Sequence, residues 1–270
     1  MIPIALTIAG SDPSGGAGIQ ADVKTFSALG VYGAAALAAL TAQNTQGVTA
    51  IHDVPPDFVA AQIDAVFSDL RVNATKIGML GRAGAIEAVA AGLERHGARD
   101  IVVDPVMVAT SGAVLLEPQA VSALRTRLLP LADLVTPNLP EAARLLDAET
   151  ARSEEEAVEQ GRALLALGPK AVLVKGGHAQ GPESVDALVT RHGVRRFAAP
   201  RLATRNTHGT GCTLSAAIAA GLAKGLGLEE AVAAAKDYVQ EALQGADALR
   251  VGRGPGPVHH FHGLWKRNPA

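Results

Sequence analysis

Short apolar runs alternate with longer amphipathic stretches along most of the chain. The stretches between the runs repeat apolar residues at helical spacing, and they predict helices over 56–70, 83–97, 117–129 and 153–168. The apolar runs themselves predict buried strands at 4–10, 34–40, 75–80, 101–106, 134–138 and 171–177. This alternation predicts βαβ units around a central, mostly parallel sheet.

The last third of the chain follows a different pattern. Residues 184–199 predict a β-hairpin with His192 and Gly193 at its turn, and two helices follow at about 209–225 and 229–246. Upstream, a Ser-x-x-Glu capping box at Ser153 marks the start of the helix over 153–168. We find no internal repeat, low-complexity linker or domain boundary, and we expect a single domain over residues 1–270.

Composition and charge narrow the class of partner. Hydrophobic residues make up 48% of the 270 residues, which is enough for a deep core, and the net charge is −2 with no basic run. Such a chain has no electrostatic footprint for nucleic acid or an anionic membrane, so we expect small-molecule partners. No apolar run reaches membrane-spanning length, the N-terminus lacks the charged segment of a secretory signal, and one cysteine cannot form an internal disulfide. We therefore expect a cytoplasmic protein.

A glycine-rich stretch, GSDPSGGAG at 10–18, follows the first predicted strand. It is not a Walker phosphate loop, because Gly16 and Ala17 stand where that motif needs Lys and Ser or Thr. The G-x-G-x-x-A pattern of dinucleotide-binding proteins fits residues 16–21, but the second strand ends in LTAQNTQ, which lacks the carboxylate that holds the ribose. A tight turn with close helix packing explains the glycines at least as well.

Single polar or soft side chains follow the other predicted strands. Each has a local explanation as a cap, a turn residue or core filler, but together they supply a distinctive set of groups. The set contains an amide that can read a ring edge, a soft apolar surface, two carboxylates suited to Mg²⁺ and a cation for phosphate. Ligands of open α/β sheets bind beyond the carboxyl ends of the strands, so this set suggests phosphoryl transfer. Its members are Gln43, Met79, Asp104, Asn138, Glu141 and Lys175.

The stretch THGTGCT at 207–213 leads directly into a helix of small residues. Its backbone N–H groups are expected to converge at the positive end of that helix and to form an anion hole. Donors fixed there would stabilise the charge that develops on the γ-phosphoryl oxygens. The dipole would also favour the thiolate of Cys212, although a small cysteine at this place could equally be a packing residue.

Eight ordered blocks of sequence, taken together, resemble the hydroxymethylpyrimidine/phosphomethylpyrimidine kinases of thiamine biosynthesis, which belong to the ribokinase superfamily. The blocks are TIAGSDPSGGAGIQADVKTFSALG, TAQNTQG, TKIGML, VVDPVM, TPNLPEA, VLVKGGH, NTHGTGCTLSAAIAAGLA and GPVHHFH, and they span about residues 4–265. The resemblance implies a ribokinase-like three-layer α/β/α sandwich, a homodimer, and ATP and Mg²⁺ as cofactors. It also implies that 4-amino-5-hydroxymethyl-2-methylpyrimidine is phosphorylated to the monophosphate and then to the diphosphate.

Two other classes of function remain open at this point. A pyridoxine- or pyridoxal-type vitamin kinase of the same superfamily is the main alternative, because Gln43 could read a pyridine as well. A dinucleotide-dependent oxidoreductase or a thiol hydrolase is the more distant one. For the hydrolase, His208 stands four residues before Cys212. Lys175, Asp104 and Glu141 at the same sheet edge argue against it.

The resemblance also implies a role for each candidate residue. Gln43 would read the aminopyrimidine edge, and Asp104 and Glu141 would hold magnesium through water. Further substrate contacts would come from Gly10, Asp22, Met79 and Val106. The ATP-binding residues would be Asn138, Lys175, Thr207 and Lys236, and the catalytic residues would be Lys175, Gly209, Thr210, Gly211 and Cys212.

Cys212 is a departure from many members of the superfamily, in which the motif ends in Gly-Asp and the aspartate is the general base. An alcohol acceptor must lose a proton during attack, so a base helps the first phosphorylation. The acceptor of the second is an anionic phosphate, and an aspartate about 4 Å away would cost on the order of 4 kcal/mol at an effective dielectric near 20. Because a thiol can be neutral or charged, we hypothesise that cysteine suits both steps.

The sequence HHFH at 259–262 looks like a metal cluster. No cysteine or carboxylate stands near these histidines in the sequence to complete a site. We interpret His259, His260 and His262 as part of a C-terminal segment of the family whose purpose is unknown.

Overall fold

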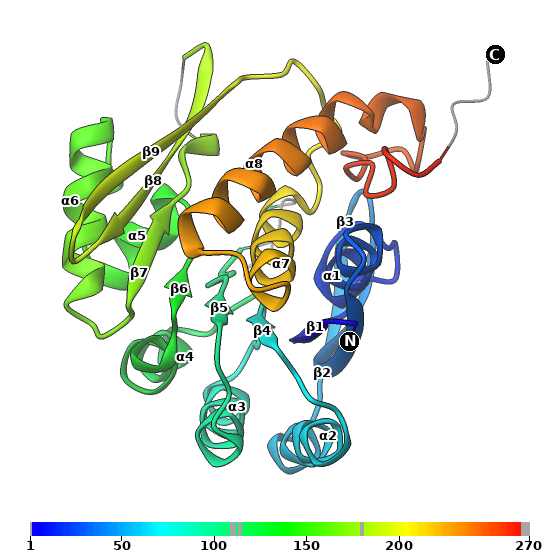
Figure 1. Cartoon of the computed structure of the whole chain (residues 1–270). Helices are drawn as coiled ribbons and strands as arrows, with labels where there is room; N and C mark the ends of the chain where they lie inside the picture. The colour runs from blue at the N-terminus through cyan, green and yellow to red at the C-terminus, as the bar shows by residue number, and fades with distance from the viewer. Residues whose placement is uncertain (1, 109–111, 113–114, 179–180, 266–270) are drawn as a thin grey trace.

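The computed structural model describes residues 2–108, 112, 115–178 and 181–265, and its centre is one nine-stranded sheet (Figure 1). The strands lie in the order β3-β2-β1-β4-β5-β6-β7-β8-β9. Six neighbouring strands, β2, β1, β4, β5, β6 and β7, run parallel to one another. At the margins, β3 is antiparallel to β2, and β8 is antiparallel to both β7 and β9. The strands are β1 (Ile4–Gly10), β2 (Tyr32–Asn44), β3 (Gly47–Asp53), β4 (Ala74–Ile77), β5 (Ile101–Val103), β6 (Leu134–Val135), β7 (Ala171–Val174), β8 (Glu183–Thr190) and β9 (Gly193–Pro200).

Helices cover both faces of this sheet (Figure 1). One face packs against α2 (Pro56–Asp69), α3 (Ala83–His96), α4 (Pro118–Ala123), α5 (Leu139–Leu146) and α6 (Glu154–Leu165). The other packs against α1 (Gly18–Ala28), α7 (Thr210–Ala223) and α8 (Leu228–Gln244). This arrangement confirms the predicted three-layer α/β/α sandwich with a mostly parallel sheet.

Alternate residues of the parallel strands supply the two hydrophobic cores. On β5, Val102 belongs to the core beneath α1, α7 and α8, whereas Val103 belongs to the core beneath the other helices. Helix α7 is buried continuously from Thr213 to Ala223 because its residues are small, and a Cβ at Gly221 would lie 3.0 Å from the side chain of Ala231 on α8. The near absence of aromatic residues is therefore a consequence of close packing between helices and sheet.

Several predicted elements differ from the observed ones at their ends. The apolar runs predicted as strands at 75–80 and 101–106 extend past the ends of β4 and β5. Met79 still accepts a backbone hydrogen bond from the amide of Gly10 at 2.9 Å, but Met79 and Val106 line a cavity. The predicted helix over 117–129 is broken after α4 into a π turn and a 3-10 turn that contains Pro130. Strand β3 and helix α5 were not predicted.

The hairpin and the cap of α6 are close to their predictions. β8 and β9 form the expected hairpin, and its two turn residues are Arg191 and His192, one position before the predicted pair. Ser153 caps α6 by accepting a hydrogen bond from the amide of Glu156. The Glu156 carboxylate accepts from the amide of Arg152 instead of that of Ser153, so the predicted capping box is only half formed.

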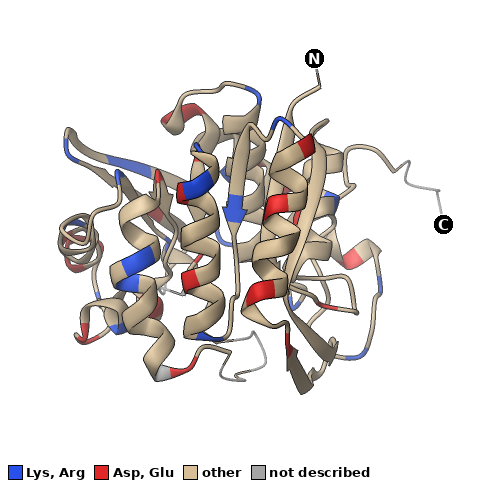
Figure 2. Ribbon diagram, turned by 90° about the horizontal axis from the view of Figure 1, so that it is seen from below, with Lys and Arg blue, Asp and Glu red and all other residues tan. Residues whose placement is uncertain are grey.

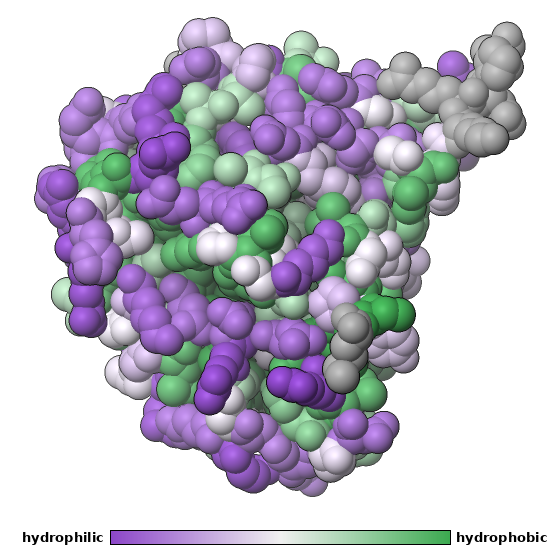
Figure 3. Space-filling view, in the orientation of Figure 1, coloured by the Kyte–Doolittle hydropathy of each residue, from purple (hydrophilic) through white to green (hydrophobic). Residues whose placement is uncertain are grey.

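Hydrophilic and hydrophobic residues are mixed on the face of the molecule seen in Figure 3, and charged residues are spread over the ribbon in Figure 2. Basic and acidic residues are interspersed on the helices seen in Figure 2, and hydrophobic residues show between hydrophilic ones near the centre of the face in Figure 3. Within the described part of the chain, no helix is both long enough and apolar enough to cross a membrane.

Candidate active site

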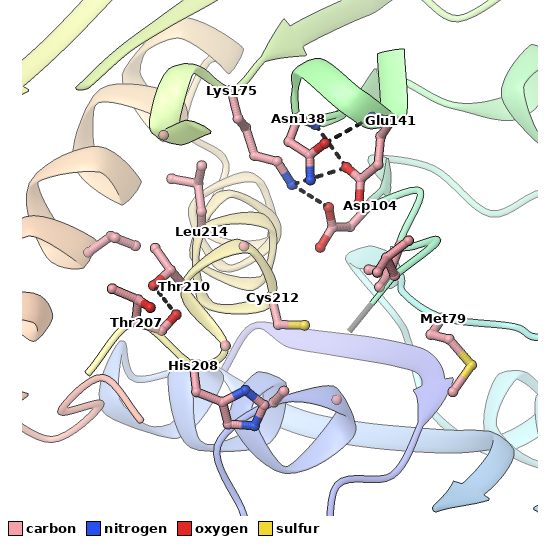
Figure 4. A pocket seen from close by; sticks show the side chains of 18 of the residues that line it. Met79, Asp104, Asn138, Glu141, Lys175, Thr207, His208, Thr210, Cys212 and Leu214 are labelled. Atoms are coloured by element: carbon pink, nitrogen blue, oxygen red, sulfur yellow. Dashed lines mark hydrogen bonds and ion pairs between the residues drawn. The ribbon is translucent and has the colours of Figure 1, made fainter. Parts of the chain in front are cut away.

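A cavity of about 730 Å³ opens at the carboxyl ends of the parallel strands. After β1 the chain forms β2 on one side of that strand and later forms β4 on its other side. The direction in which strands are added to the sheet therefore reverses at β1. Loops after β1, β4, β5, β6 and β7 meet the starts of α5 and α7 there (Figure 4). The predicted site residues, Asp22 excepted, all line this cavity.

Two carboxylates and one ammonium group form a buried cluster at one side of the cavity (Figure 4). Lys175, directly after β7, places Nζ 2.7 Å from Oδ1 of Asp104 and 3.9 Å from Oε2 of Glu141. Asn138 caps α5 in a full capping box, in which its side chain accepts from the amide of Glu141 and the Glu141 carboxylate accepts from the amide of Asn138. The cap fixes Glu141 beside Asp104.

The two carboxylates differ in their affinity for protons. Burial alone would raise the pKa of Asp104, but the ammonium groups of Lys175 and Lys76 outweigh burial and hold that pKa below its usual value. Burial raises the pKa of Glu141 to about 7, Lys175 opposes that rise, and the charge of Asp104 adds to it. A further cation beside Glu141 would therefore favour the ionised carboxylate form of this residue and would lower its pKa.

The cluster fits a hydrated divalent cation. No group of three or more His, Cys, Asp or Glu side chains that could enclose a metal ion is found among the described residues. Asp104 and Glu141 offer two carboxylates, which is the number that Mg²⁺ commonly takes from a protein while water and phosphate oxygens complete its octahedron. The donor set thus suits a magnesium ion that arrives with a nucleotide.

The turn before α7, which comprises residues 207–209, and the first residues of α7 face this cluster. Gly209 has φ +77°, and a Cβ there would lie 1.8 Å from the carbonyl oxygen of Gly16, so glycine alone fits. An ideal Cβ at Gly211 would lie 3.3 Å from Nζ of Lys175 and 3.8 Å from Oδ2 of Asp104. The N-terminus of α7, which carries the positive end of the helix dipole, is therefore directly opposite the charged cluster.

Cys212 points its sulfur into the cavity (Figure 4) but differs electrostatically from the prediction. Burial raises the pKa of its thiol to about 11; Lys76 opposes this shift, while Asp22 and Asp104 add to it. The helix dipole was expected to favour the thiolate of Cys212, but the thiol pKa in this structure is raised and not lowered. Desolvation, with Asp22 and Asp104 adding to it, outweighs the ammonium group of Lys76, and the thiol is neutral at neutral pH.

The glycine-rich stretch after β1 is a closed turn around Asp12. Its carboxylate accepts hydrogen bonds from the amides of Ser14, Gly16 and Ala17 at 2.9, 3.2 and 2.8 Å. These amides are thus occupied by a side chain of the same turn instead of being free for a pyrophosphate. Of the two interpretations, the structure supports the tight turn with close packing.

His208 belongs to the same turn and not to a cysteine pair. Its Nε2 lies 2.7 Å from Oδ2 of Asp12, and both side chains are almost fully buried. This contact joins the glycine-rich stretch to the turn before α7, over 196 residues of sequence. It removes the geometric basis for a thiol hydrolase in which His208 would activate Cys212.

The opposite wall of the cavity contains the predicted acceptor residues. Gln43 on β2 lines it together with Met79 and Val106, which follow β4 and β5. A Cβ at Gly10 would lie 2.6 Å from Cε of Met79, so the glycine at the end of β1 makes room for the methionine side chain. This wall combines one amide with flexible apolar side chains, which suits a small heteroaromatic ring.

Asp22 is the one predicted site residue that does not line the cavity. It lies on α1 with no exposed surface, where its carboxylate binds Nζ of Lys76 at 2.8 and 3.0 Å and accepts from Oγ1 of Thr7 at 2.6 Å. The prediction of direct substrate contact is therefore wrong. Lys76 lines the cavity instead, and the sequence signal for it was a lysine inside the apolar run of β4.

The far end of the cavity contains Thr207 and Lys236, both predicted to contact nucleotide. Nζ of Lys236 lies 2.7 Å from Oδ2 of Asp186, whose other oxygen accepts from the amide of Gly176. Lys236 thus braces the turn after β7. Sequence reasoning also missed other lining residues of the cavity, among them Ser11, Thr41, Arg144, Ser184, Arg201, Leu202, Leu214, Val239, Gln240 and Leu243.

The C-terminal histidines pack behind the turn before α7 and form no metal cluster among the described residues. Nε2 of His260 lies 3.1 Å from Oγ1 of Thr213, and the hydroxyl of Tyr238 donates to the carbonyl of His260 at 2.6 Å. Nδ1 of His262 lies 3.5 Å from a carboxylate oxygen of Glu241. That carboxylate could not be found by looking beside the histidines in the sequence, because it comes from α8.

Comparison with known proteins gives one consistent result. Residues 12–259 match the sequence model of a family described as phosphomethylpyrimidine kinase. A hydroxymethylpyrimidine/phosphomethylpyrimidine kinase of Salmonella typhimurium is 60% identical over 261 residues, which cover 97% of this chain and 98% of that protein.

Two solved structures extend the comparison to the fold. A phosphomethylpyrimidine kinase from Clostridium difficile is 44% identical with a TM-score of 0.80, covering 90% of this chain and 99% of that one. An ADP complex of Bacillus subtilis pyridoxal kinase is 35% identical with a TM-score of 0.91, covering 98% of this chain and 100% of that one.

Proposed function

The chain belongs to the phosphomethylpyrimidine kinase family, and from that premise we propose how its cavity carries out the reaction. The protein is a kinase of thiamine biosynthesis that phosphorylates 4-amino-5-hydroxymethyl-2-methylpyrimidine and then its monophosphate. The observation that carries this conclusion is 60% identity over nearly the whole length of a kinase with both activities in its name. The cavity adds a physical reason, since an acceptor wall and a phosphate-binding turn face each other across it.

The acceptor ring occupies the wall formed by Gln43, Met79 and Val106. The Gln43 side chain carries both donors and an acceptor, so it can pair with the amino group and a ring nitrogen of an aminopyrimidine. Met79 covers the ring with a polarizable surface. The hydroxymethyl group then points toward Cys212 and the start of α7, where the two walls of the cavity meet (Figure 4).

ATP occupies the remaining space and directs its phosphates at Lys175, Asn138 and the turn before α7. The ADP complex of a pyridoxal kinase of the same fold supports this use of a nucleotide. Thr207 and Lys236 lie at the far end, and Leu214, Val239 and Leu243 give that end an apolar wall for a purine. Magnesium, held through water by Asp104 and Glu141, would neutralise phosphate charge when it is bound.

The chain's own groups then favour transfer by position and charge. The Lys175 ammonium stays beside the phosphoryl group, and the amides of Gly209 and Gly211 stabilise its equatorial oxygens at the positive end of α7. The amide of Thr210 donates to the carbonyl of Thr207 at 3.2 Å and joins them only when that hydrogen bond opens. Gly209 allows this turn to lie against Gly16, which fixes the amides in place before substrate arrives. Cys212 sits where the acceptor hydroxyl loses its proton, and it can take that proton as a thiolate.

Three further properties are proposals of the same kind. We expect one domain over residues 1–270, a homodimer, and a cytoplasmic enzyme with small-molecule substrates. A pyridoxal-type kinase remains the second candidate, because the pyridoxal kinase of Bacillus subtilis shares the fold at 35% identity. The higher identity to pyrimidine kinases over the whole chain disfavours it as the main activity.

One assay tests the function and its alternative together. ADP release is measured with Mg²⁺ and ATP on the aminopyrimidine alcohol, on its monophosphate and on pyridoxal, and the products are separated by chromatography. We expect turnover of the first two at similar kcat/KM, with pyridoxal at least tenfold slower. Turnover of pyridoxal alone would overturn the proposal.

A further inference from the structure

Lys76 and Asp22 form an ion pair with no exposed surface beneath the cavity. Lys76 lies on β4 and Asp22 on α1, and Nζ contacts both carboxylate oxygens at 2.8 and 3.0 Å. Taking two charges out of water costs several kcal/mol for each ion, and their attraction does not generally exceed that cost. Stability is therefore a poor explanation for this pair, and we ask what it does for the cavity.

The surroundings hold the ammonium group in one place. Thr7 on β1 donates to Oδ2 of Asp22 at 2.6 Å and orients the carboxylate. A Cβ at Gly78 would lie 2.8 Å from Nζ of Lys76 and 2.9 Å from Cβ of Ala9, so the glycine after β4 leaves the space that the ammonium occupies. Two strands of the sheet and helix α1 thus fix one positive charge beneath the floor of the cavity.

Of this pair, Lys76 lies nearer the cavity, directly beneath its wall. Lys76 is among the lining residues together with Cys212, whereas Asp22 lies behind it. The charged groups that act on the sulfur are Lys76, Asp22, Asp104 and Lys175, from β4, from α1 and from the loops after β5 and β7. Among these groups, Lys76 is the strongest influence that favours the thiolate, and Asp22 is the strongest acidic group that opposes it.

We propose that Lys76 is a positioning residue of the transfer step, whose fixed ammonium stabilises negative charge on the Cys212 sulfur while Asp22 limits that stabilisation. In the first phosphorylation the acceptor O–H bond breaks, its proton passes to the thiolate, the oxygen bonds to the γ-phosphorus, and ADP leaves. This step rests on the proposed function. The effect of the two charges on the sulfur does not, because it exists without substrate.

The chain contains one cysteine, so its alkylation reports on Cys212 alone. Below the thiol pKa, the rate of reaction with iodoacetamide is proportional to the thiolate fraction at a given pH. At pH 8 we expect Lys76→Met to react at least fivefold more slowly than the wild type and Asp22→Asn at least fivefold faster. Thr7→Val, which removes a hydrogen bond to Asp22 and no charge, is the matched control and should stay within twofold.

The opposite signs separate an electrostatic role from a structural one. If the pair only maintained the fold, both substitutions would loosen the site and would change the rate in the same direction. The proposal is overturned if the alkylation rate changes in the same direction in both variants, or if it changes in neither. If Lys76→Met does not fold because Asp22 is left unpaired, the double variant Lys76→Met/Asp22→Asn is compared with Asp22→Asn, and it should react at least fivefold more slowly.

Kinase assays on the folded variants complete the test. We expect Lys76→Met to lower kcat for the alcohol at least tenfold while the KM for ATP stays within twofold, because the charge acts at the acceptor end. Unchanged kcat with an altered alkylation rate would overturn the role of Lys76 in transfer. Failure of the proposed function would instead appear as an inactive wild type whose alkylation rates still follow the predicted order.

Discussion

At the scale of single residues, the cavity is defined by the charges that surround Cys212. A thiol with a pKa of about 11 is almost entirely protonated at neutral pH, so it places no fixed charge next to an anionic acceptor. An aspartate at the same position would place one there. The neutral thiol of the free enzyme thus fits the second phosphorylation directly, and only the first needs a small thiolate fraction.

Substitution of Cys212 tests this division of roles. We expect Cys212→Ser to slow the first phosphorylation more than the second, because only the alcohol acceptor loses a proton. Cys212→Asp should harm the second most, since a like charge about 4 Å away costs on the order of 4 kcal/mol, about a thousandfold in rate. The rates are measured with each purified acceptor.

The pH dependence provides the control for these variants. Below a pKa of about 11, each pH unit raises the thiolate fraction tenfold, so kcat/KM of the wild type for the alcohol should rise between pH 7 and 9. Cys212→Ser should flatten this rise. If each substitution slowed both steps equally, Cys212 would be a packing residue and the backbone donors would supply the catalysis.

Site residues at the ends of strands could be predicted from the sequence. Ion pairs between residues far apart in the sequence could not. Asp104 and Lys175 were found because the carboxyl ends of parallel strands converge, and a polar side chain just after an apolar run is conspicuous. Asp12 and His208 are 196 residues apart, and Asp22 and Lys76 are 54 apart. No local pattern connects such pairs, so Asp22 was assigned to the substrate when its partner is a lysine.

At the scale of elements, the C-terminal segment over 256–262 supports the turn before α7. The amide of His208 donates to the carbonyl of Gly256 at 3.0 Å. The Thr213 hydroxyl donates to the carbonyl of Gly209 at 2.8 Å and lies 3.1 Å from Nε2 of His260. Since the Thr213 proton is used, the Nε2–H of His260 donates to the hydroxyl oxygen. His260 of the HHFH sequence is therefore the first member of a hydrogen-bond chain that runs through the Thr213 hydroxyl to the carbonyl of Gly209.

Acid should weaken this chain through His260. Burial lowers its folded-state pKa to about 3, below the unfolded value of 6.5, so its stabilising contribution is present above pH 6.5 and is lost as the pH falls toward 3. The loss is about 1.4 kcal/mol per pH unit in that window. We expect His260→Gln, which keeps a donor but cannot titrate, to lose less stability than the wild type between pH 7 and pH 5.

Urea unfolding at the two pH values measures this difference. His260→Leu is the control for the hydrogen bond itself, and it should lower the free energy of unfolding by about 1–3 kcal/mol at pH 7 because the buried hydroxyl of Thr213 loses its donor. An identical acid response in His260→Gln and the wild type would contradict the assignment of His260 as a buried neutral histidine.

At the scale of the whole molecule, the two margins of the sheet differ in how they are protected. The β9 margin carries Arg195 and Arg196, and Arg196 pairs with Glu154 and Glu183. Each margin exposes one large apolar side chain to a similar degree, Val194 on β9 and Ile51 on β3, but the exposed residues 49–52 of β3 include no Lys, Arg, Asp or Glu. Charged side chains on an edge strand oppose pairing with another chain, whereas an exposed edge without them favours it. We therefore expect that the proposed homodimer forms through β3 and the neighbouring β2.

Matched substitutions at the two margins test the dimer. Ile51→Lys should shift the protein to monomer in sedimentation velocity, because an unpaired charge would be buried in the interface. Val194→Lys on β9, a residue of similar exposure at 42%, should leave the dimer intact. Because Gln43 belongs to β2, an interface there would also stabilise the acceptor wall, and the Ile51→Lys monomer should show a raised KM for the pyrimidine and an unchanged KM for ATP. If both variants remained dimeric, the interface would not lie at the β3 margin, and this prediction would be wrong.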